Sequence, residues 1–202
     1  MPRKKLIYTH EYPYHVYARS NNHEWFYLPK ERVLEIFKIE LKRLVIKFDV
    51  LLHSFVLMDN HYHMLVTTAP KATLGEFMCI FQKSVSRKIN SESGRVNHVF
   101  GGPYRASLIR SAEYYFQVYK YVYRNPVEAG ICGVVEEYPF STLTMDEFGI
   151  CSPTSGIAHM IPTDKKLDWL NQCDEFLISN SIKRGLRKTE FKPVFSRLKI
   201  RQ

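Results

Sequence analysis

Two histidines stand two residues apart in the segment MDNHYHMLV, residues 58–66, which otherwise has the character of an apolar strand. Side chains at positions i and i+2 of a strand point to the same face and lie roughly 6.5 Å apart along it. His61 and His63 could therefore bind one cation together. Alternatively, Asn60, His61 and His63 are simply the polar end of a strand at the mouth of a hairpin. A pattern this short often occurs by chance, so the two histidines alone do not decide between these interpretations.

A second polar group falls in QVYKYVYRNP, residues 117–126. Residues four apart share one face of a helix, so Gln117, Tyr121 and Asn125 would form a polar stripe. A second stripe on roughly the opposite side holds three more tyrosines: Tyr115, Tyr119 and Tyr123. This second stripe is typical of packing or base-contacting residues. Tyr121 differs from them because its phenol is flanked by two amides.

The elements that position these residues follow from hydrophobic spacing and turn residues. Strands are predicted at 12–22, 50–58, 61–68 and 104–109, with Asp59-Asn60 as the turn of a hairpin. Helices are predicted to begin at Pro29, at Thr73, which has a capping-box partner in Glu76, and at Ser111. The last of them is expected to end at Asn125-Pro126.

The predicted order is strand, helix, hairpin, helix, strand, helix. This order is typical of the split βαβ, ferredoxin-like fold with one additional helix. We therefore expect an α+β protein whose antiparallel sheet has helices on one face, an extra tyrosine-bearing helix, and a C-terminal helical and basic extension.

The chain is expected to divide near residue 145, into a main domain over 1–145 and an extension over 146–202. Within the extension, DKKLDWLNQCDEFLISN predicts one amphipathic helix. The last twenty residues hold eight basic side chains against the single acid Glu190, and so carry most of the net charge of +9. They are either a DNA-binding arm or an end without function, and their concentrated charge favours the arm.

The composition narrows the class of protein. A net charge of +9 and a pI near 9.3 indicate an anionic partner, nucleic acid first and a membrane surface second. No segment resembles a signal peptide or approaches the roughly 20 apolar residues of a membrane span. Four scattered cysteines without a C-x-x-C pair suggest neither a zinc knuckle nor a disulfide framework. We expect a cytoplasmic protein that does not bind membranes.

Four segments, in order and at their spacings, resemble the single-tyrosine HUH (IS200-like) transposases: YHVYARSNN, MDNHYHMLV, VFGGPYRASLI and YVYRNPVEAG. Within that family the chain is most similar to the REP-associated tyrosine transposases, which act on repetitive extragenic palindromes. The resemblance runs from about residue 8 to about residue 145.

The resemblance implies a role for each matching residue. His61 and His63 match the two histidine ligands of the family, Tyr121 matches its nucleophile, and Asn125 stands where the family has a third polar ligand. It implies a divalent metal, Mg or Mn, although two imidazoles and an amide favour metals softer than Mg. Two departures are visible: Pro103 intervenes where Arg usually follows the two glycines, and Tyr62 replaces an apolar residue on the opposite side of the strand.

The implied activity is a metal-dependent endonuclease and strand transferase that cuts single-stranded DNA near hairpins and forms a 5'-phosphotyrosine on Tyr121. Basic residues and interleaved aromatics suit single-stranded or hairpin DNA. The candidate DNA contacts are Arg19, Lys83, Arg87, Lys88 and Arg105. The chain could act as a monomer or as a homodimer.

Two other functions remain open from the sequence. The same fold could be a non-catalytic regulator that binds hairpin DNA or RNA. It could also be a metal-dependent nuclease that uses water, with Tyr121 merely orienting it. The intact set of two histidines, tyrosine and asparagine favours the transposase-like enzyme, because a binding module has no need of all four.

Overall fold

The computed structural model describes residues 6–144, 163–173 and 176–194. Its centre is a four-stranded antiparallel sheet with the order β2-β3-β1-β4. The strands are β1 (Tyr14–Arg19), β2 (Leu51–Leu57), β3 (His61–Thr67) and β4 (Arg105–Leu108). This order is that of the split βαβ fold, so the predicted fold class is confirmed.

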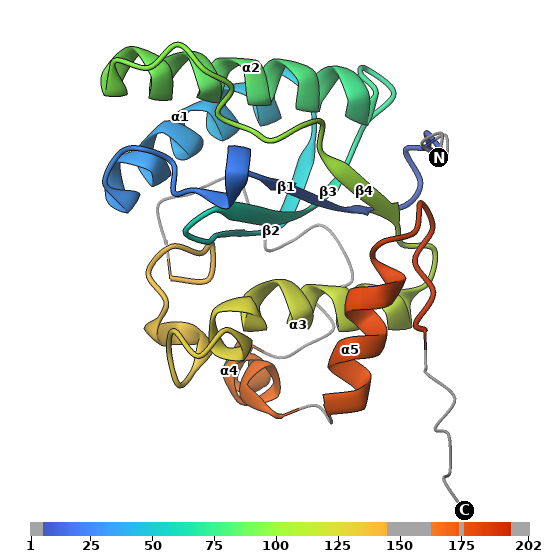
Figure 1. Cartoon of the computed structure of the whole chain (residues 1–202). Coiled ribbons are helices and arrows are strands. Elements are labelled where there is room, and N and C mark those ends of the chain that lie inside the picture. Colours follow the sequence, from blue (N-terminus) through green and yellow to red (C-terminus); the bar gives the residue numbers. More distant parts are fainter. Residues whose placement is uncertain (1–5, 145–162, 174–175, 195–202) are drawn as a thin grey trace, which may run out of the picture.

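Helices cover both faces of the sheet, as Figure 1 shows. On one face lie α1 (Lys30–Phe48) and α2 (Leu74–Ser93). On the other lies the tyrosine-bearing helix α3 (Ala112–Glu128), with α4 (Thr163–Asn171) and α5 (Phe176–Gly185) packed beyond it. Two short 3-10 helices, η1 (Asn21–His23) and η2 (Val135–Glu137), complete the described elements.

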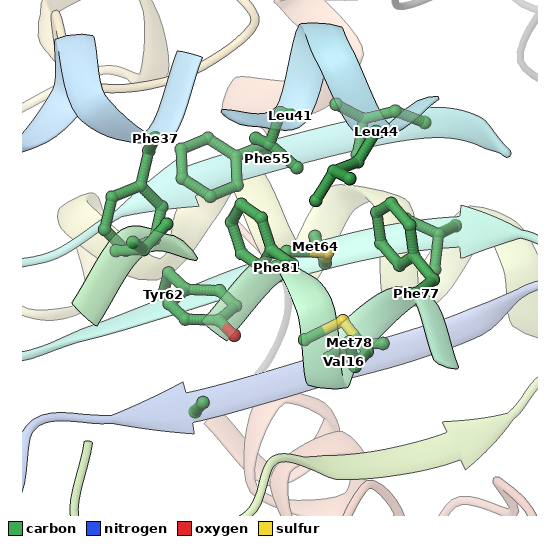
Figure 2. Packing of buried hydrophobic residues seen from close by; sticks show 14 of the residues in the cluster. Val16, Phe37, Leu41, Leu44, Phe55, Tyr62, Met64, Phe77, Met78 and Phe81 are labelled. Carbon is green, nitrogen blue, oxygen red and sulfur yellow. The ribbon is translucent and has the colours of Figure 1, made fainter. Parts of the chain in front are cut away.

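The core between the sheet and α1 and α2 holds a cluster of aromatic rings among aliphatic side chains. Figure 2 shows Tyr62 and Phe55 of the hairpin meeting Phe37 of α1 and Phe81 of α2. Phe37 contacts Tyr62 edge-on, with ring centroids 5.3 Å apart. Because Tyr62 is fully buried on this side, its neighbours His61 and His63 must point to the opposite face, as the alternation of the strand predicts.

Helix α2 begins with the predicted capping box. The Thr73 hydroxyl accepts a hydrogen bond from the backbone N–H of Glu76, and the Glu76 carboxylate accepts one from the backbone N–H of Thr73. We expect Thr73→Ala to lower the free energy of unfolding by about 1 kcal/mol. For a chain of this size, this corresponds to a Tm lower by about 2–4 °C in a calorimetric scan. Ser86→Ala, inside the same helix, is the control and should leave Tm nearly unchanged, and an equal loss in both variants would contradict the capping role.

The prediction that α3 ends at Asn125-Pro126 was wrong, since the helix continues to Glu128. A proline inside a helix leaves one carbonyl without its donor, here that of Val122. The side-chain amide of Asn125 lies 3.4 Å from the Val122 oxygen and 2.7 Å from that of Tyr121, and donates to both. The helix ends soon afterwards, and Gly130 adopts a positive φ of 69° just beyond it.

The segment predicted as one C-terminal helix is two, α4 and α5, so that prediction was also wrong. The guanidinium of Arg124 in α3 donates to the carbonyls of Leu170 and Asn171 at distances of 3.1 and 3.0 Å. These two carbonyls would otherwise accept the next turn of the helix. Leu170 of α4 and Ile182 of α5 are both buried in the cluster around α3.

Segments of the chain also line both edges of the sheet. At the β4 edge, Leu108 donates to the carbonyl of Thr189 and accepts from the backbone N–H of Phe191. At the β2 edge, the backbone N–H of Leu57 donates to the carbonyl of Phe140, and that of Thr142 to the carbonyl of Phe55. The C-terminal extension is therefore partly built into the sheet. The segments 145–162 and 195–202, with three of the eight tail cations, lie outside the described residues.

Candidate active site

The polar residues of three strands share the sheet face that α3 covers. His63 of β3 stands opposite Tyr17 of β1, and Tyr17 stands opposite Arg105 of β4. Two residues farther along β1, Arg19 stands opposite His61 of β3. Alternation along each strand thus brings both predicted histidines and two of the predicted DNA-contacting arginines to one surface.

His61 and His63 lie side by side, with ring centroids 5.0 Å apart. The Nδ1 atom of His61 is 2.8 Å from Oδ1 of Asn60, and the Nδ1 atom of His63 is 2.9 Å from Nε2 of His15. Within the described part of the chain, the Nε2 atom of neither ring takes part in a hydrogen bond. Both rings therefore have one nitrogen held by the protein and one available, the arrangement in which histidine binds a metal.

Tyr121 projects from α3 onto these rings. Its ring meets His63 edge-on at 5.6 Å between centroids and His15 at 5.9 Å. Only 9% of its surface is exposed. The tyrosine therefore reaches the histidines of its own chain, and no second chain is needed to bring these groups together.

The second tyrosine stripe packs inside the protein, which is one of the two roles predicted for it. Tyr115, Tyr119 and Tyr123 are buried and contact one another in sequence along α3. Tyr115 bonds to His53 through its hydroxyl, at 3.1 Å, and Tyr123 bonds to Thr142, at 3.0 Å. Tyr121 is the only one of the four whose ring contacts His15 and His63 among the described aromatic pairs.

Burial dominates the electrostatics of the site. It raises the pKa of the Tyr121 phenol above its usual value, and the nearby charge of Glu128 acts in the same direction. A side-chain hydrogen bond with Asn125 and the charge of Arg187 lower the pKa of Tyr121 by smaller amounts. Burial also lowers the pKa of His61 to about 4 and that of His63 well below its usual value. Both imidazoles are therefore neutral at pH 7, as metal ligands must be.

Asn125 follows Tyr121 by one turn of α3. Its amide nitrogen is used in donating to the backbone, so its oxygen is left as the acceptor atom of the side chain. Among the described residues no group of three or more His, Cys, Asp or Glu could hold a metal ion. The atom types nonetheless fit a divalent cation, because imidazole nitrogens and an amide oxygen are both donors that such metals accept.

Three neighbours of the site were not singled out as site residues in the sequence: His15, Tyr17 and the amide of Asn60. The Tyr17 ring contacts both histidine rings, with centroids 5.4 Å from that of His61 and 5.0 Å from that of His63. The signal that could have found the first two is the alternation of His15, Tyr17 and Arg19 along β1, which puts all three on one face. Their closeness to His63, however, depends on the register between strands 48 residues apart.

Arg19 and Arg105 line one hollow of about 780 Å³ beside the site. Tyr17 forms part of its wall, as do Arg187 and Lys188 from the segment after α5. Since Tyr17 also touches both histidine rings, this basic hollow adjoins the histidine and tyrosine cluster.

The other three predicted DNA contacts lie on α2, over the opposite face of the sheet. Lys83 lines a separate, smaller hollow with Asn97 and His98. Lys88 lies 3.8 Å from the Glu40 carboxylate of α1. Lys83, Arg87 and Lys88 are thus not brought together with the arginines of the first hollow, and an α2 contact with DNA stays a prediction.

The comparison with family models decides the family. Residues 8–125, more than half of the chain, match the model described as "Transposase IS200 like". The chain belongs to the IS200-like transposase family. The matched range includes both histidines, Tyr121 and Asn125, and transposases of this kind generally depend on a metal.

One solved structure supports the fold. The chain is similar to a REP-associated tyrosine transposase bound to a REP hairpin, with 16% identity and a TM-score of 0.58 over 78% of this chain and 90% of that one. A structure named "putative transposase", from Deinococcus radiodurans R1, matches with 15% identity and a TM-score of 0.42 over 60% of this chain and 94% of that one. A search of curated proteins found no match. Among the described residues, no helix is long and apolar enough to cross a membrane.

Proposed function

We propose that this IS200-like transposase is a metal-dependent endonuclease and strand transferase that cuts single-stranded DNA near hairpins through a covalent 5'-phosphotyrosine on Tyr121. The observation that carries the proposal is the packing of the Tyr121 ring against His63 and His15, with Asn125 one turn away on the same helix. A hairpin as substrate is supported by the REP hairpin bound to the structurally similar transposase.

In the cutting step, the Tyr121 oxygen forms a bond to the phosphorus and the bond from phosphorus to the 3' oxygen breaks. The phenol loses a proton, and the leaving 3' oxygen gains one to become a hydroxyl. The aryl phosphate keeps a phosphodiester linkage, so a 3'-hydroxyl of another strand end can later attack it and release Tyr121. This accounts for both cutting and joining without an external energy source.

Several of the described residues have distinct roles in this cutting step. Helix α3 holds the nucleophile in position, which is the main requirement when two reacting groups must meet. Burial keeps Tyr121 protonated in the free protein, while Asn125 and Arg187 favour its phenolate. His61, His63 and Asn125 would hold the divalent cation, Mg or Mn. When bound, the cation would polarise the scissile phosphate and offset its developing charge.

The test is a denaturing gel of the purified protein with labelled hairpin oligonucleotides taken from the flanks of its gene. Parallel reactions contain Mg²⁺, Mn²⁺ or a chelator. We expect a metal-dependent band of lower mobility that protease treatment collapses to a short peptide adduct containing Tyr121. Cleavage without an adduct would indicate a water-using nuclease, and binding without any cleavage would indicate a regulator.

The hollow beside the site is the proposed path of the DNA strand. Arg19→Ala and Arg105→Ala should each weaken binding of a single-stranded oligonucleotide and lower the slope of log K against log salt by roughly 0.7, the contribution of one phosphate contact. Fluorescence anisotropy in chelator at several salt concentrations measures both quantities. The control is Arg32→Ala on α1, where Arg32 is already paired with Glu92 and Glu35. Equal slopes in all four proteins would exclude this path.

A further inference from the structure

We propose that His15 is a positioning residue of the metal site: it accepts the hydrogen bond of His63 Nδ1–H and so keeps the Nε2 lone pair of His63 directed to the cation. The inference rests on the proposed metal-dependent function and adds to it a residue of β1 that does not itself touch the metal.

The geometry of the pair is that of a close, enclosed contact. Nε2 of His15 and Nδ1 of His63 are 2.9 Å apart, and the two rings are stacked at 29° with centroids 5.1 Å apart. His15 is 3% exposed and His63 is 4% exposed. Water therefore cannot readily replace either partner, and the loss of one would leave a buried nitrogen of the other without a hydrogen bond.

The tautomer of His63 follows from this bond. A neutral imidazole carries one N–H, so one ring must donate and the other accept. If His63 donates from Nδ1, its Nε2 has a free lone pair and can bind a cation. If His15 donates instead, the proton of His63 sits on Nε2 and blocks it. Only the first arrangement is compatible with a bound metal, and His15 supplies the acceptor that it requires.

His61 is supported in the same way from a different element. Its Nδ1 atom contacts Oδ1 of Asn60 at 2.8 Å, and Asn60 is itself fixed because its amide donates to the carbonyl of His23 at 2.9 Å. Each proposed histidine ligand thus has a partner at Nδ1 and an open Nε2. In metal sites each histidine ligand usually has a hydrogen-bond partner at its other ring nitrogen, as both of these histidines do. Two histidines that only filled space in the core would not need such a partner on each ring.

Two substitutions separate positioning from packing. In His15→Gln, the amide oxygen can still accept from His63 Nδ1–H. In His15→Leu, the side chain remains large and apolar but offers no acceptor. Neither substitution alters a proposed metal ligand or Tyr121, and thermal unfolding reports whether each variant is folded.

The first measurement is Mn²⁺ binding in the absence of DNA. The decrease in the EPR signal of free Mn²⁺ reports how much of the ion is bound. We expect His15→Leu to weaken Mn²⁺ binding by roughly 10–100-fold, and His15→Gln to stay within about threefold of wild type. Equal affinity of wild type and His15→Leu would overturn the inference while leaving the proposed enzyme intact. Equal weakening in both variants would also overturn it, since it would indicate a role in packing alone.

The second measurement uses the wild-type chain and is independent of how the variants fold. Long-range ¹H–¹⁵N spectra of the protein with Zn²⁺ as a diamagnetic substitute should show His63 protonated at Nδ1 and bound through Nε2. Coordination of His63 through Nδ1, or no metal binding at all, would overturn the inference. If the spectra agree but the cleavage gel shows no adduct, the metal site stands and the proposed phosphotyrosine chemistry fails separately.

Discussion

Tyr121→Phe is expected to remove the covalent DNA adduct completely while leaving hairpin binding within about twofold of wild type. The substitution deletes the only oxygen that the proposed reaction uses as a nucleophile and keeps the ring that packs on His63 and His15. Residual strand cleavage should also be absent, because without the phenol oxygen the first bond to phosphorus cannot form. The denaturing gel with Mn²⁺ measures the loss, and anisotropy with a hairpin oligonucleotide measures binding.

The matched control is Tyr119→Phe, two residues away on the same helix. Tyr119 is also buried, but it packs on Tyr115, Tyr123 and Trp169 and does not contact the histidines. It should retain the adduct at close to the wild-type level. An adduct that persisted in Tyr121→Phe, or one that disappeared in both variants, would assign the nucleophile to another residue.

Acid is expected to destabilise the metal-free protein strongly below about pH 6.5. Burial lowers the pKa of His15 to about 3 and those of His53 and His61 to about 4 in the folded chain, against about 6.5 when unfolded. At pH values between the folded-state and unfolded-state pKa, the unfolded chain binds more protons than the folded chain. The free energy of unfolding is therefore highest above pH 6.5 and falls as the pH drops toward 4. Even if the folded-state pKa of each of these three rings lay only about one below its unfolded-state pKa, the free energy of unfolding would fall by roughly 4 kcal/mol. The total for a protein is typically about 5–15 kcal/mol.

Urea unfolding at several pH values in chelator measures this loss. A free energy of unfolding that stayed constant from pH 7 to pH 4.5 would contradict the prediction. His53→Gln provides an internal comparison, since His53 bonds Thr67 and Tyr115 and is not part of the proposed metal site. This variant should be less stable at pH 7 but should lose stability less steeply with falling pH.

The strands and the first two helices could be predicted because each depends on local sequence. The alternation in HYHMLVT and the Thr73 and Glu76 capping pair act within a few residues, so the structure differs from the prediction there by only one or two positions. The two errors arose where a distant or unusual side chain decides the outcome. The Asn125 side chain donates to the Val122 carbonyl, so α3 continues past Pro126. The Arg124 side chain donates to the last two carbonyls of α4, where that helix ends.

The candidate site shows the same division. The spacing of His61 and His63, and that of Tyr121 and Asn125, places each pair on one face of its own element. Nothing local shows that Tyr121 of α3 meets His63 of β3, and here the family resemblance supplied the link. His15 was missed because its partner lies 48 residues away, and only the pairing of β1 with β3 brings them together.

The two short segments that pair with β2 and β4 affect how readily this protein associates with other copies of itself. An open strand edge invites a further strand, and this is a common route to aggregation and to exchange of elements between chains. Here Phe140 and Thr142 take up part of one edge, and Thr189 and Phe191 part of the other. Removing the chain from residue 189 onward would uncover β4, and we expect such a truncated protein to aggregate for reasons unrelated to its chemistry.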